Sequence, residues 1–262
     1  MSDSLPERST NRPSDVLKVL LVLFAIVGLA YALDIHPRAS NELPPRAAEE
    51  RRDTSILAAT AATTEFRPMR LPQTAAACEA SLKQAGIDFR KVSTAAADGI
   101  AWPIRLVGPI AGVRIEGGDK PEAETNYLDC RLAATLLVWA PSLRARGIVG
   151  IDHFSMYRAQ AHVDGGEKLS GHAAGRAIDL GRLELQDGRK LNILDAWKNR
   201  KAGADPCGSY RDDAAGELLR EVVCDAAQRG LFQVIVTPHH NAAHADHVHL
   251  EIDPQASSLW IR

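Results

Sequence analysis

A long apolar run near the N-terminus places the strongest constraint on this chain. Residues 16–33 read "VLKVLLVLFAIVGLAYAL", in which Lys18 is the one charged residue. A run without a polar face does not pack as an amphipathic helix on a soluble core, so we expect it to enter lipid. It sits at the lower limit of the roughly 17–25 residues of a spanning helix and exceeds the roughly 7–15 of a signal-peptide core. We predict an uncleaved anchor, with a signal cleaved near Ala30–Ala32 as the alternative.

The apolar run divides the rest of the chain into three parts. Residues 1–15 are expected to stay in the cytoplasm, and everything after residue 33 is expected to be exported. Residues 34–76 are rich in Pro, Arg, Glu, Ala and Thr. Such a segment buries little apolar surface, so we predict a flexible linker. Residues 77–262 have the alternating apolar and polar pattern of a folded domain.

The charge of the chain argues against a nucleic-acid partner. Its 31 Lys and Arg residues and 33 Asp and Glu residues give a formal net charge of -2, and no block of five or six like charges occurs. A chain of this kind has no basic field that attracts a polyanion.

Cysteine usage agrees with export to an oxidising compartment. The four cysteines all follow the apolar run, and none forms a CxxC pair. An even number in this context favours two disulfides over four buried thiols, although three pairings exist. We favour the sequential pairing, which closes the shorter loops: Cys78 with Cys130, and Cys207 with Cys224.

The exported part predicts an α+β domain with a small, mostly antiparallel sheet and flanking helices. Thr74 and Gly86 mark the two ends of a first helix. Leucines at helical spacing from Leu128 to Trp139 predict a second helix ended by Pro141, and a third helix fits 213–229. Strands fit segments starting at residues 103, 113, 147, 176, 190, 231 and 247, with Asp187-Gly188 as a hairpin turn.

A histidine and an aspartate lie seven residues apart in "LSGHAAGRAIDL", residues 169–180. Gly175 permits a tight turn after His172, and a strand follows. Strand alternation points Asp179 to the face opposite Ile178. A carboxylate buried on that face needs a cation or hydrogen-bond donors. This segment therefore offers two candidate metal ligands, His172 and Asp179.

A second histidine-rich segment, "HADHVHLEI", covers residues 244–252. Strand alternation places His247 and His249 on one face and Val248 on the other. Catalytic zinc commonly takes three nitrogen or oxygen ligands and leaves a fourth position open. His172, Asp179 and one of the pair His247 and His249 supply such a set. His244 is expected in the preceding loop, and His239 and His240 are expected to be solvated.

The two motifs together resemble those of the LAS metallopeptidases, a group that includes lysostaphin, D-alanyl-D-alanine peptidase and hedgehog relatives. Residues 78–253 are more closely similar to the bacterial extensin-like C-terminal domain, through the hairpin before "LDAWK", Cys224 followed by a Gly-Leu-Phe strand, and "NAAHADHVHLEI". The resemblance implies a LAS-type core and a zinc ion bound by His172, Asp179 and His249. It also implies that His247 is a catalytic partner.

Two further residues have roles that the resemblance implies less directly. "FSMYRAQ" resembles a segment in which an arginine faces the scissile carbonyl, so Arg158 is a candidate oxyanion stabiliser, with a surface ion pair as the alternative. Many extensin-like domains have a cysteine where this chain has Tyr157.

Asp246 lies where some relatives have a glutamate as general base. We rank His247 above it as the base, because strand alternation points Asp246 away from the metal unless a bulge turns it. Asp246 is then either catalytic itself or the residue that orients a neighbouring imidazole.

The sequence thus predicts a zinc-dependent hydrolase of peptidoglycan peptide bonds, of the D-alanyl-D-alanine carboxypeptidase or endopeptidase type. Its expected partners are peptidoglycan stem peptides. Residues 16–33 are expected to attach the chain to a membrane. We expect a single-pass inner-membrane protein with its C-terminal domain in the periplasm, or a periplasmic protein if the segment is cleaved. The alternative is a non-catalytic, metal-containing module that binds the cell wall.

Overall fold

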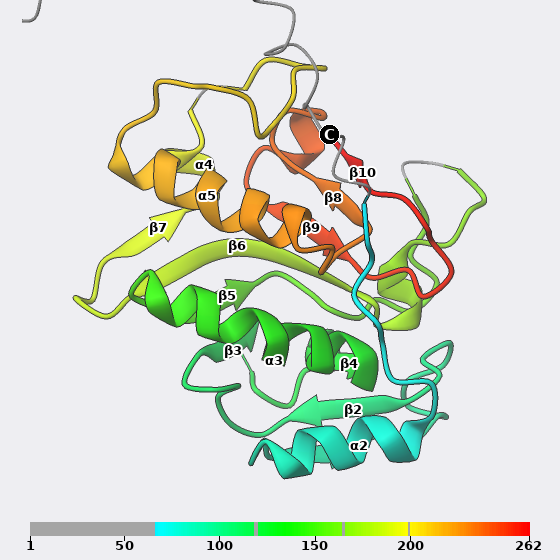
Figure 1. Cartoon of the computed structure of the whole chain (residues 1–262). Helices are drawn as coiled ribbons and strands as arrows, with labels where there is room; N and C mark the ends of the chain where they lie inside the picture. The colour runs from blue at the N-terminus through cyan, green and yellow to red at the C-terminus, as the bar shows by residue number, and fades with distance from the viewer. Residues whose placement is uncertain (1–65, 118–119, 164–165, 199) are drawn as a thin grey trace, which may run out of the picture. The chain divides into compact units, whose positions relative to one another are not determined.

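The computed structural model describes residues 66–117, 120–163, 166–198 and 200–262 (Figure 1). The predicted cytoplasmic segment 1–15, the apolar segment 16–33 and most of the predicted linker lie outside these residues. Within the described part of the chain, no helix is long and apolar enough to cross a membrane.

The described chain alternates short helices with strands. In chain order the elements are α2 (Ala75–Gln84), β1 (Phe89–Lys91), β2 (Pro103–Leu106), β3 (Arg114–Gly117), η1 (Glu124–Asn126), β4 (Tyr127–Asp129), α3 (Cys130–Ala145), β5 (Ile148–His153), η2 (Gly171–Ala174), β6 (Ala177–Leu185), β7 (Lys190–Asn192), α4 (Ile193–Ala196), α5 (Ala214–Gln228), β8 (Val234–Val236), η3 (Ala242–His244), β9 (Val248–Glu251) and β10 (Trp260–Ile261).

The predicted α+β class is correct, but the sheet is larger and more mixed than predicted. Seven strands form one sheet in the order β10-β8-β9-β6-β5-β3, with β7 paired to β6, and β1, β2 and β4 form a second, three-stranded sheet. The pairs β3–β5 and β8–β10 are parallel, and the other pairs are antiparallel. A parallel pair needs a long crossover connection. Helix α3 lies within the crossover from β3 to β5, which short-range patterns do not reveal.

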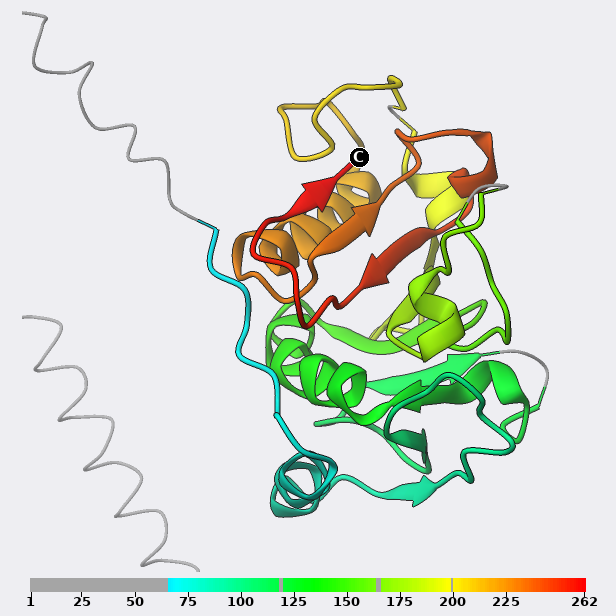
Figure 2. The same ribbon diagram turned by 90° about the vertical axis from the view of Figure 1, so that its right-hand side faces the viewer.

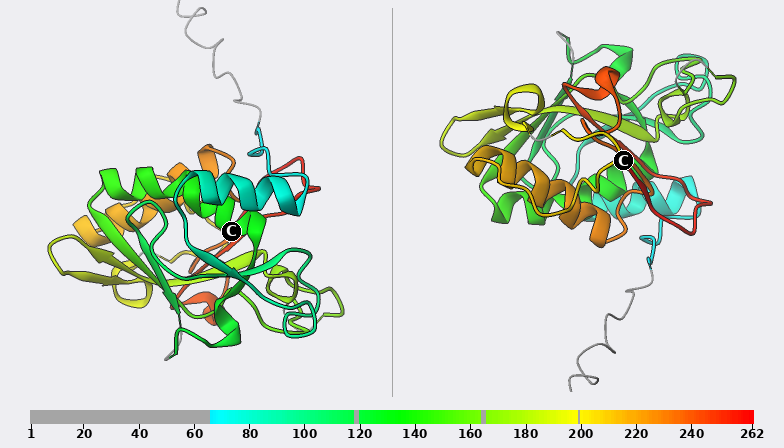
Figure 3. Two further views of the ribbon diagram at one scale, coloured as in Figure 1. Left: turned by 90° about the horizontal axis from the view of Figure 1, so that it is seen from below. Right: turned by 90° about the horizontal axis from the view of Figure 1, so that it is seen from above.

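The helices cover one face of the large sheet. Figure 3 shows α2, α3 and α5 gathered on the same side of the strands, and Figure 2 shows α5 behind β8 and β10. The core between the two layers contains Trp139 of α3 and Phe232, whose ring centroids lie 5.4 Å apart at an edge-to-face angle. The polar motifs lie on the other side of β6 and β9, so the helices leave that face available for a site.

Helix α3 differs from its prediction at both ends. Leu128 belongs to β4, and the helix begins at Cys130, capped by the Asp129 side chain, which accepts from the Arg131 N–H. Pro141 lies inside the helix rather than at its end. Pro141 is exposed, so its ring displaces no core side chain, and buried Leu143 anchors the last turn. Packing of the last turn therefore overrides the local signal of a proline.

Residues 66–76, which the composition assigned to the linker, pack against the domain instead. The Met69 N–H donates to the Gly230 carbonyl at 2.9 Å, and Met69 and Leu71 contact the main core. Gly230 has φ +64°, and a Cβ there would lie 2.1 Å from the Arg67 carbonyl oxygen. The composition of this segment does not predict the contact, because Met69 and Leu71 are the apolar side chains that make it and the segment is otherwise poor in such residues.

Both predicted disulfides are present. Cys78 of α2 is bonded to Cys130 at the start of α3, and Cys207 is bonded to Cys224 of α5. The two cysteines of the first bond are 52 residues apart in sequence, and those of the second are 17 residues apart. Sequential pairing is therefore confirmed.

Removing the first disulfide is expected to cost more stability than removing the second. In the chain-entropy description the loops separated by 52 and 17 residues correspond to about 4 and about 3 kcal/mol of unfolding free energy. Cys78→Ala with Cys130→Ala should thus lower the denaturation midpoint more than Cys207→Ala with Cys224→Ala. Urea titrations at one temperature measure both. A larger loss from the second pair would contradict the entropic explanation.

Candidate metal centre

The segment before β6 brings His172 against the sheet. The Ser170 hydroxyl accepts from the His172 N–H and caps the short helix η2, which ends at Gly175 with φ +60°. A Cβ at Gly175 would lie 2.9 Å from the Asp129 nitrogen, so the turn requires glycine. The chain then enters β6, where Asp179 pairs in register with His249 of the antiparallel strand β9. A seven-residue spacing and one strand pairing therefore assemble three side chains.

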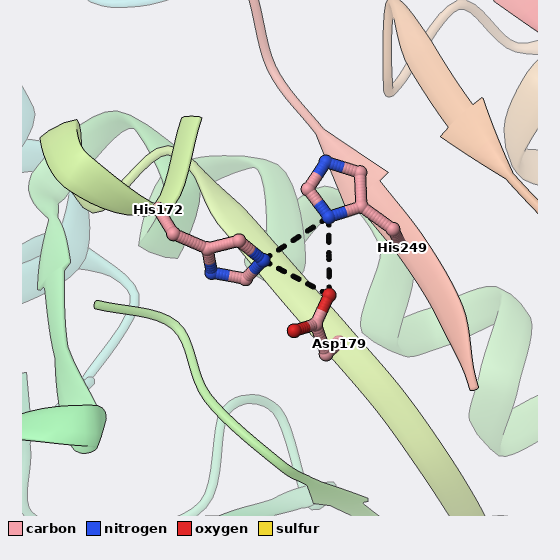
Figure 4. Close-up of side chains that lie close together, drawn as sticks. All are labelled: His172, Asp179 and His249. Atoms are coloured by element: carbon pink, nitrogen blue, oxygen red, sulfur yellow. Dashed lines mark hydrogen bonds and ion pairs between the residues drawn. The ribbon is translucent and has the colours of Figure 1, made fainter. Parts of the chain in front are cut away.

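His172, Asp179 and His249 meet in a compact triangle (Figure 4). His172 Nε2 lies 2.9 Å from Asp179 Oδ1, Asp179 Oδ1 lies 3.0 Å from His249 Nδ1, and the two nitrogens are 3.1 Å apart. All three residues are buried. Ligands of a tetrahedral zinc ion with bonds of about 2.0–2.1 Å lie about 3.3 Å apart, so the spacing fits such an ion closely.

Outer hydrogen bonds orient both imidazoles toward the same point. His172 Nδ1 lies 3.2 Å from the Met156 carbonyl oxygen, and His249 Nε2 lies 3.1 Å from Glu251 Oε2. Each partner only accepts, so each of these nitrogens must carry the hydrogen. In neutral rings the two inner nitrogens then present lone pairs toward Asp179 Oδ1. With both rings neutral, three electron-rich atoms at this distance repel one another unless a proton or a metal cation lies between them. The donor set of two nitrogens and one oxygen is one that zinc accepts.

The electrostatics of the site agree with this reading. Burial lowers the pKa of His172 more than the Asp179 carboxylate raises it, so this ring is neutral. Burial also opposes protonation of His249, but its hydrogen bonds to Asp179 and Glu251 prevail and raise its pKa to about 9. Burial would favour the neutral acid at Asp179, yet the two imidazoles hold its pKa far below the usual range. A proton on His249 thus supplies the positive charge that the triangle requires.

Glu251 is a part of the site that the sequence reading missed. Its Oε2 accepts from His249 Nε2 and, at 3.2 Å, from the backbone N–H of Gly171. Gly171 precedes His172, so this carboxylate ties together the two segments that carry the histidines. A Cβ at Gly171 would lie 2.4 Å from the Glu251 carboxyl carbon. The signal was present, because strand alternation places Glu251 on the same face as His249.

His247 lies beside the triangle and is positioned by Asp246. Its Nε2 is 3.8 Å from Asp179 Oδ1, and its Nδ1 is 2.8 Å from Asp246 Oδ1. The Asp246 side chain is 51% exposed and is directed away from the cavity that His247 lines. Asp246 only accepts, so in a neutral ring Nδ1 carries the hydrogen and Nε2 presents its lone pair on the cavity side.

Arg158 also faces the triangle. Its Nη2 lies 3.4 Å from Asp179 Oδ2, while 54% of the side chain remains exposed. Its backbone N–H donates to the His172 carbonyl at 3.2 Å. Tyr157, which stands where related domains were expected to have cysteine, is buried, and its hydroxyl donates to the Asp98 carbonyl at 2.9 Å. That anchor fixes the backbone next to Arg158 without a third disulfide.

A cavity of about 400 Å³ opens onto these groups. Arg158, His247 and the three residues of the triangle lie on one side of it. Val234, Val236 and Trp260 supply apolar surface, and His162, His240 and His244 also line it. The site thus combines a polar centre with apolar contact surface, the usual composition of a small-molecule or peptide site.

The expectation that His239 is solvated is wrong. His239 is 2% exposed, its Nδ1 donates to the Lys201 carbonyl at 2.9 Å, and its Nε2 accepts from Arg220 Nη1 at 3.0 Å. Burial lowers its pKa. The local turn pattern could not predict this contact, because the Arg220 guanidinium comes from α5.

His244, expected in a loop, lies in η3 and lines the cavity.

Comparison with known proteins gives one match. The family described as "Extensin-like protein C-terminus" matches residues 76–260. No curated protein and no solved structure matches the chain. The matched range contains all the residues of the triangle, together with Arg158, Asp246, His247 and Glu251.

Loss of the Glu251 carboxylate should weaken metal binding. Glu251→Ala removes the partner that orients His249, and such outer contacts contribute about 10- to 100-fold in metal affinity. Glu251→Gln keeps an acceptor oxygen and should lose less. Zinc titration against a competing chelator measures both, with exposed Glu217→Ala in α5 as the control. Equal affinity of Glu251→Ala and the unaltered protein would exclude this role.

Metal affinity should also depend on pH through His249. Its pKa of about 9 in the metal-free protein means that zinc must displace one proton. The apparent affinity should therefore increase about tenfold per pH unit between pH 6 and pH 8. The same proton stabilises the metal-free fold fully below the unfolded-state pKa of about 6.5, and this contribution is lost as pH rises through about 9. A pH-independent affinity would contradict the assignment.

Proposed function

We propose a zinc-dependent peptidoglycan hydrolase activity for this chain, which belongs to the extensin-like protein C-terminus family. One observation supports the metal above all others. The outer hydrogen bonds of His172 and His249 force both inner nitrogens to face Asp179 Oδ1 within about 3 Å. For neutral rings this arrangement is unfavourable without a cation. A proton on His249 fills that place in the metal-free protein, and a zinc ion would displace it.

The remaining polar groups support hydrolysis of a carbonyl compound. A zinc ion held by the triangle would supply Lewis-acid polarisation of the scissile carbonyl and acidify a nucleophilic water. His247 Nε2 faces the cavity as an acceptor, so it takes the proton of the water and later gives it to the leaving amine. Asp246 holds the ring in the required tautomer and stabilises the imidazolium that forms. The Arg158 guanidinium, half exposed beside Asp179, donates to the developing oxyanion.

The substrate class and location follow from the LAS resemblance of the two motifs and from the apolar segment 16–33. Peptide bonds of peptidoglycan stem peptides are the proposed substrates. We propose that the domain lies in the periplasm, attached to the inner membrane by the N-terminal segment or released after its cleavage. The two disulfides support an oxidising compartment.

A non-catalytic wall-binding module is the competing proposal. It shares the metal triangle but gives no role to His247 and Asp246. The Asp246–His247 contact beside the cavity favours hydrolysis, because a catalytic base needs a fixed tautomer and a binding surface does not require one.

Replacing His247 separates these proposals. His247→Ala should keep one zinc per chain and lower kcat on purified muropeptides by about 100- to 10,000-fold, since it removes the general base. Asp246→Asn should lower kcat by about tenfold, because the ring keeps its nitrogen and loses only its orientation. Mass spectrometry of the products and of bound metal measures both quantities. Bound zinc with no fragments from the unaltered protein would favour the wall-binding module.

A further inference from the structure

A second cleft reaches the Asp246–His247 pair from the Nδ1 side of the imidazole. It has a volume of about 550 Å³ and extends along β3, β5, β6 and β7 to α4. Asp246 and Phe154 line it, whereas His247 lines the first cavity. The catalytic imidazole and its carboxylate therefore stand between two separate recesses, and the proposed chemistry uses only one of them.

Apolar side chains form part of the wall of this second cleft. Phe154 and Leu194 both line it, and each is 51% exposed. The Phe154 ring packs over Gly181, where a Cβ would lie 2.8 Å from it, and its centroid is 5.7 Å from that of His247. An exposed aromatic ring beside a catalytic histidine offers contact area to a substrate chain that passes over it.

The charges that line the cleft do not balance. Its cations pair with three of its carboxylates: Arg114 with Glu116 and Glu184, Lys190 with Glu184, and Arg182 with Asp152. Two more carboxylates line it, Asp195 and Asp246. Asp195 accepts from Asn192, and Asp246 contacts His247. Lys198 also interacts electrostatically with Asp195, but its ion pair is with Asp213. The cleft thus retains negative charge for a cationic ligand.

A buried histidine at the same cleft supplies a second, independent observation. His153 lines the cleft and is 3% exposed, yet neither ring nitrogen has a hydrogen-bond partner within the described residues. The ring leaves no room for a side chain at Gly117, where a Cβ would lie 2.0 Å from it. Burial lowers its pKa to about 4, so the ring is neutral and has one nitrogen that accepts. Buried polar groups without partners are rare and ask for an explanation.

We propose that this cleft binds a primary ammonium group of a substrate peptide that continues past the scissile bond. Asp195 provides the negative charge, His153 an acceptor nitrogen, and Phe154 with Leu194 the apolar contacts for the stem that carries the amine. This inference rests on the proposed hydrolase function and sharpens it. A substrate that fills recesses on both sides of His247 is cut internally, so the activity is that of an endopeptidase acting on amine-bearing, cross-linked peptides.

The test compares one substrate with and without its amine. The substrate is a purified cross-linked muropeptide dimer with free amines, and the comparison is the same dimer after N-acetylation. The variants are Asp195→Asn and, as a matched control, Asp187→Asn in the β6–β7 turn, where Asp187 pairs with Arg189 outside the cleft. N-acetylation should raise KM of the unaltered protein about tenfold, the scale of one charge-assisted contact. Asp195→Asn should raise KM about tenfold for the free-amine dimer alone.

A binding measurement keeps the inference separate from catalysis. Calorimetric titration of the uncut dimer into the His247→Ala protein, and into chelator-treated unaltered protein, should show the same preference for free amines and the same loss in Asp195→Asn. Amine-dependent binding without cleavage would overturn the hydrolase proposal and sustain the cleft. Cleavage that is indifferent both to acetylation and to Asp195→Asn would overturn the cleft proposal. Removal of terminal residues only, with the cross-link intact, would overturn the endopeptidase assignment.

Discussion

Three electron-rich atoms converge on one point between η2, β6 and β9, and this convergence sets the geometry of the whole site. Asp179 and His249 face one another because β6 and β9 pair in antiparallel register at these two residues. His172 joins them because η2 turns at Gly175 directly before β6. Each element is ordinary, but their junction buries a carboxylate between two imidazoles. Such a junction is costly unless a positive charge is present.

Other features of the fold support this junction. Glu251 binds both the Gly171 backbone and His249, and the Met156 carbonyl fixes the outer nitrogen of His172. The Ser155 hydroxyl contacts the second oxygen of Asp179 at 3.3 Å. The helices α3 and α5 pack on the opposite side of the sheet and leave the face of β6 and β9 that carries the triangle uncovered (Figure 3).

Much of the local structure could be predicted from the sequence, because local signals decide it. Capping by Thr74, the Asp187-Gly188 turn and strand alternation around His249 act within a few residues, and both disulfides were paired correctly. The failures involve distant partners. Pro141 stays helical because its last turn packs, His239 is buried by an arginine from α5, and the parallel strands require knowledge of the whole sheet. Glu251 was missed for another reason, since its alternation signal was present but a glutamate on a strand is usually solvated.

We propose that His172, Asp179 and His249 hold one zinc ion. Crystals of the domain grown at neutral pH with one equivalent of zinc test this proposal, by anomalous scattering measured on both sides of the zinc absorption edge. We expect one anomalous peak, bonded to His172 Nε2, Asp179 Oδ1 and His249 Nδ1, and its loss in Asp179→Ala. A fully ordered triangle with no peak, or zinc bound only at other residues, would contradict it.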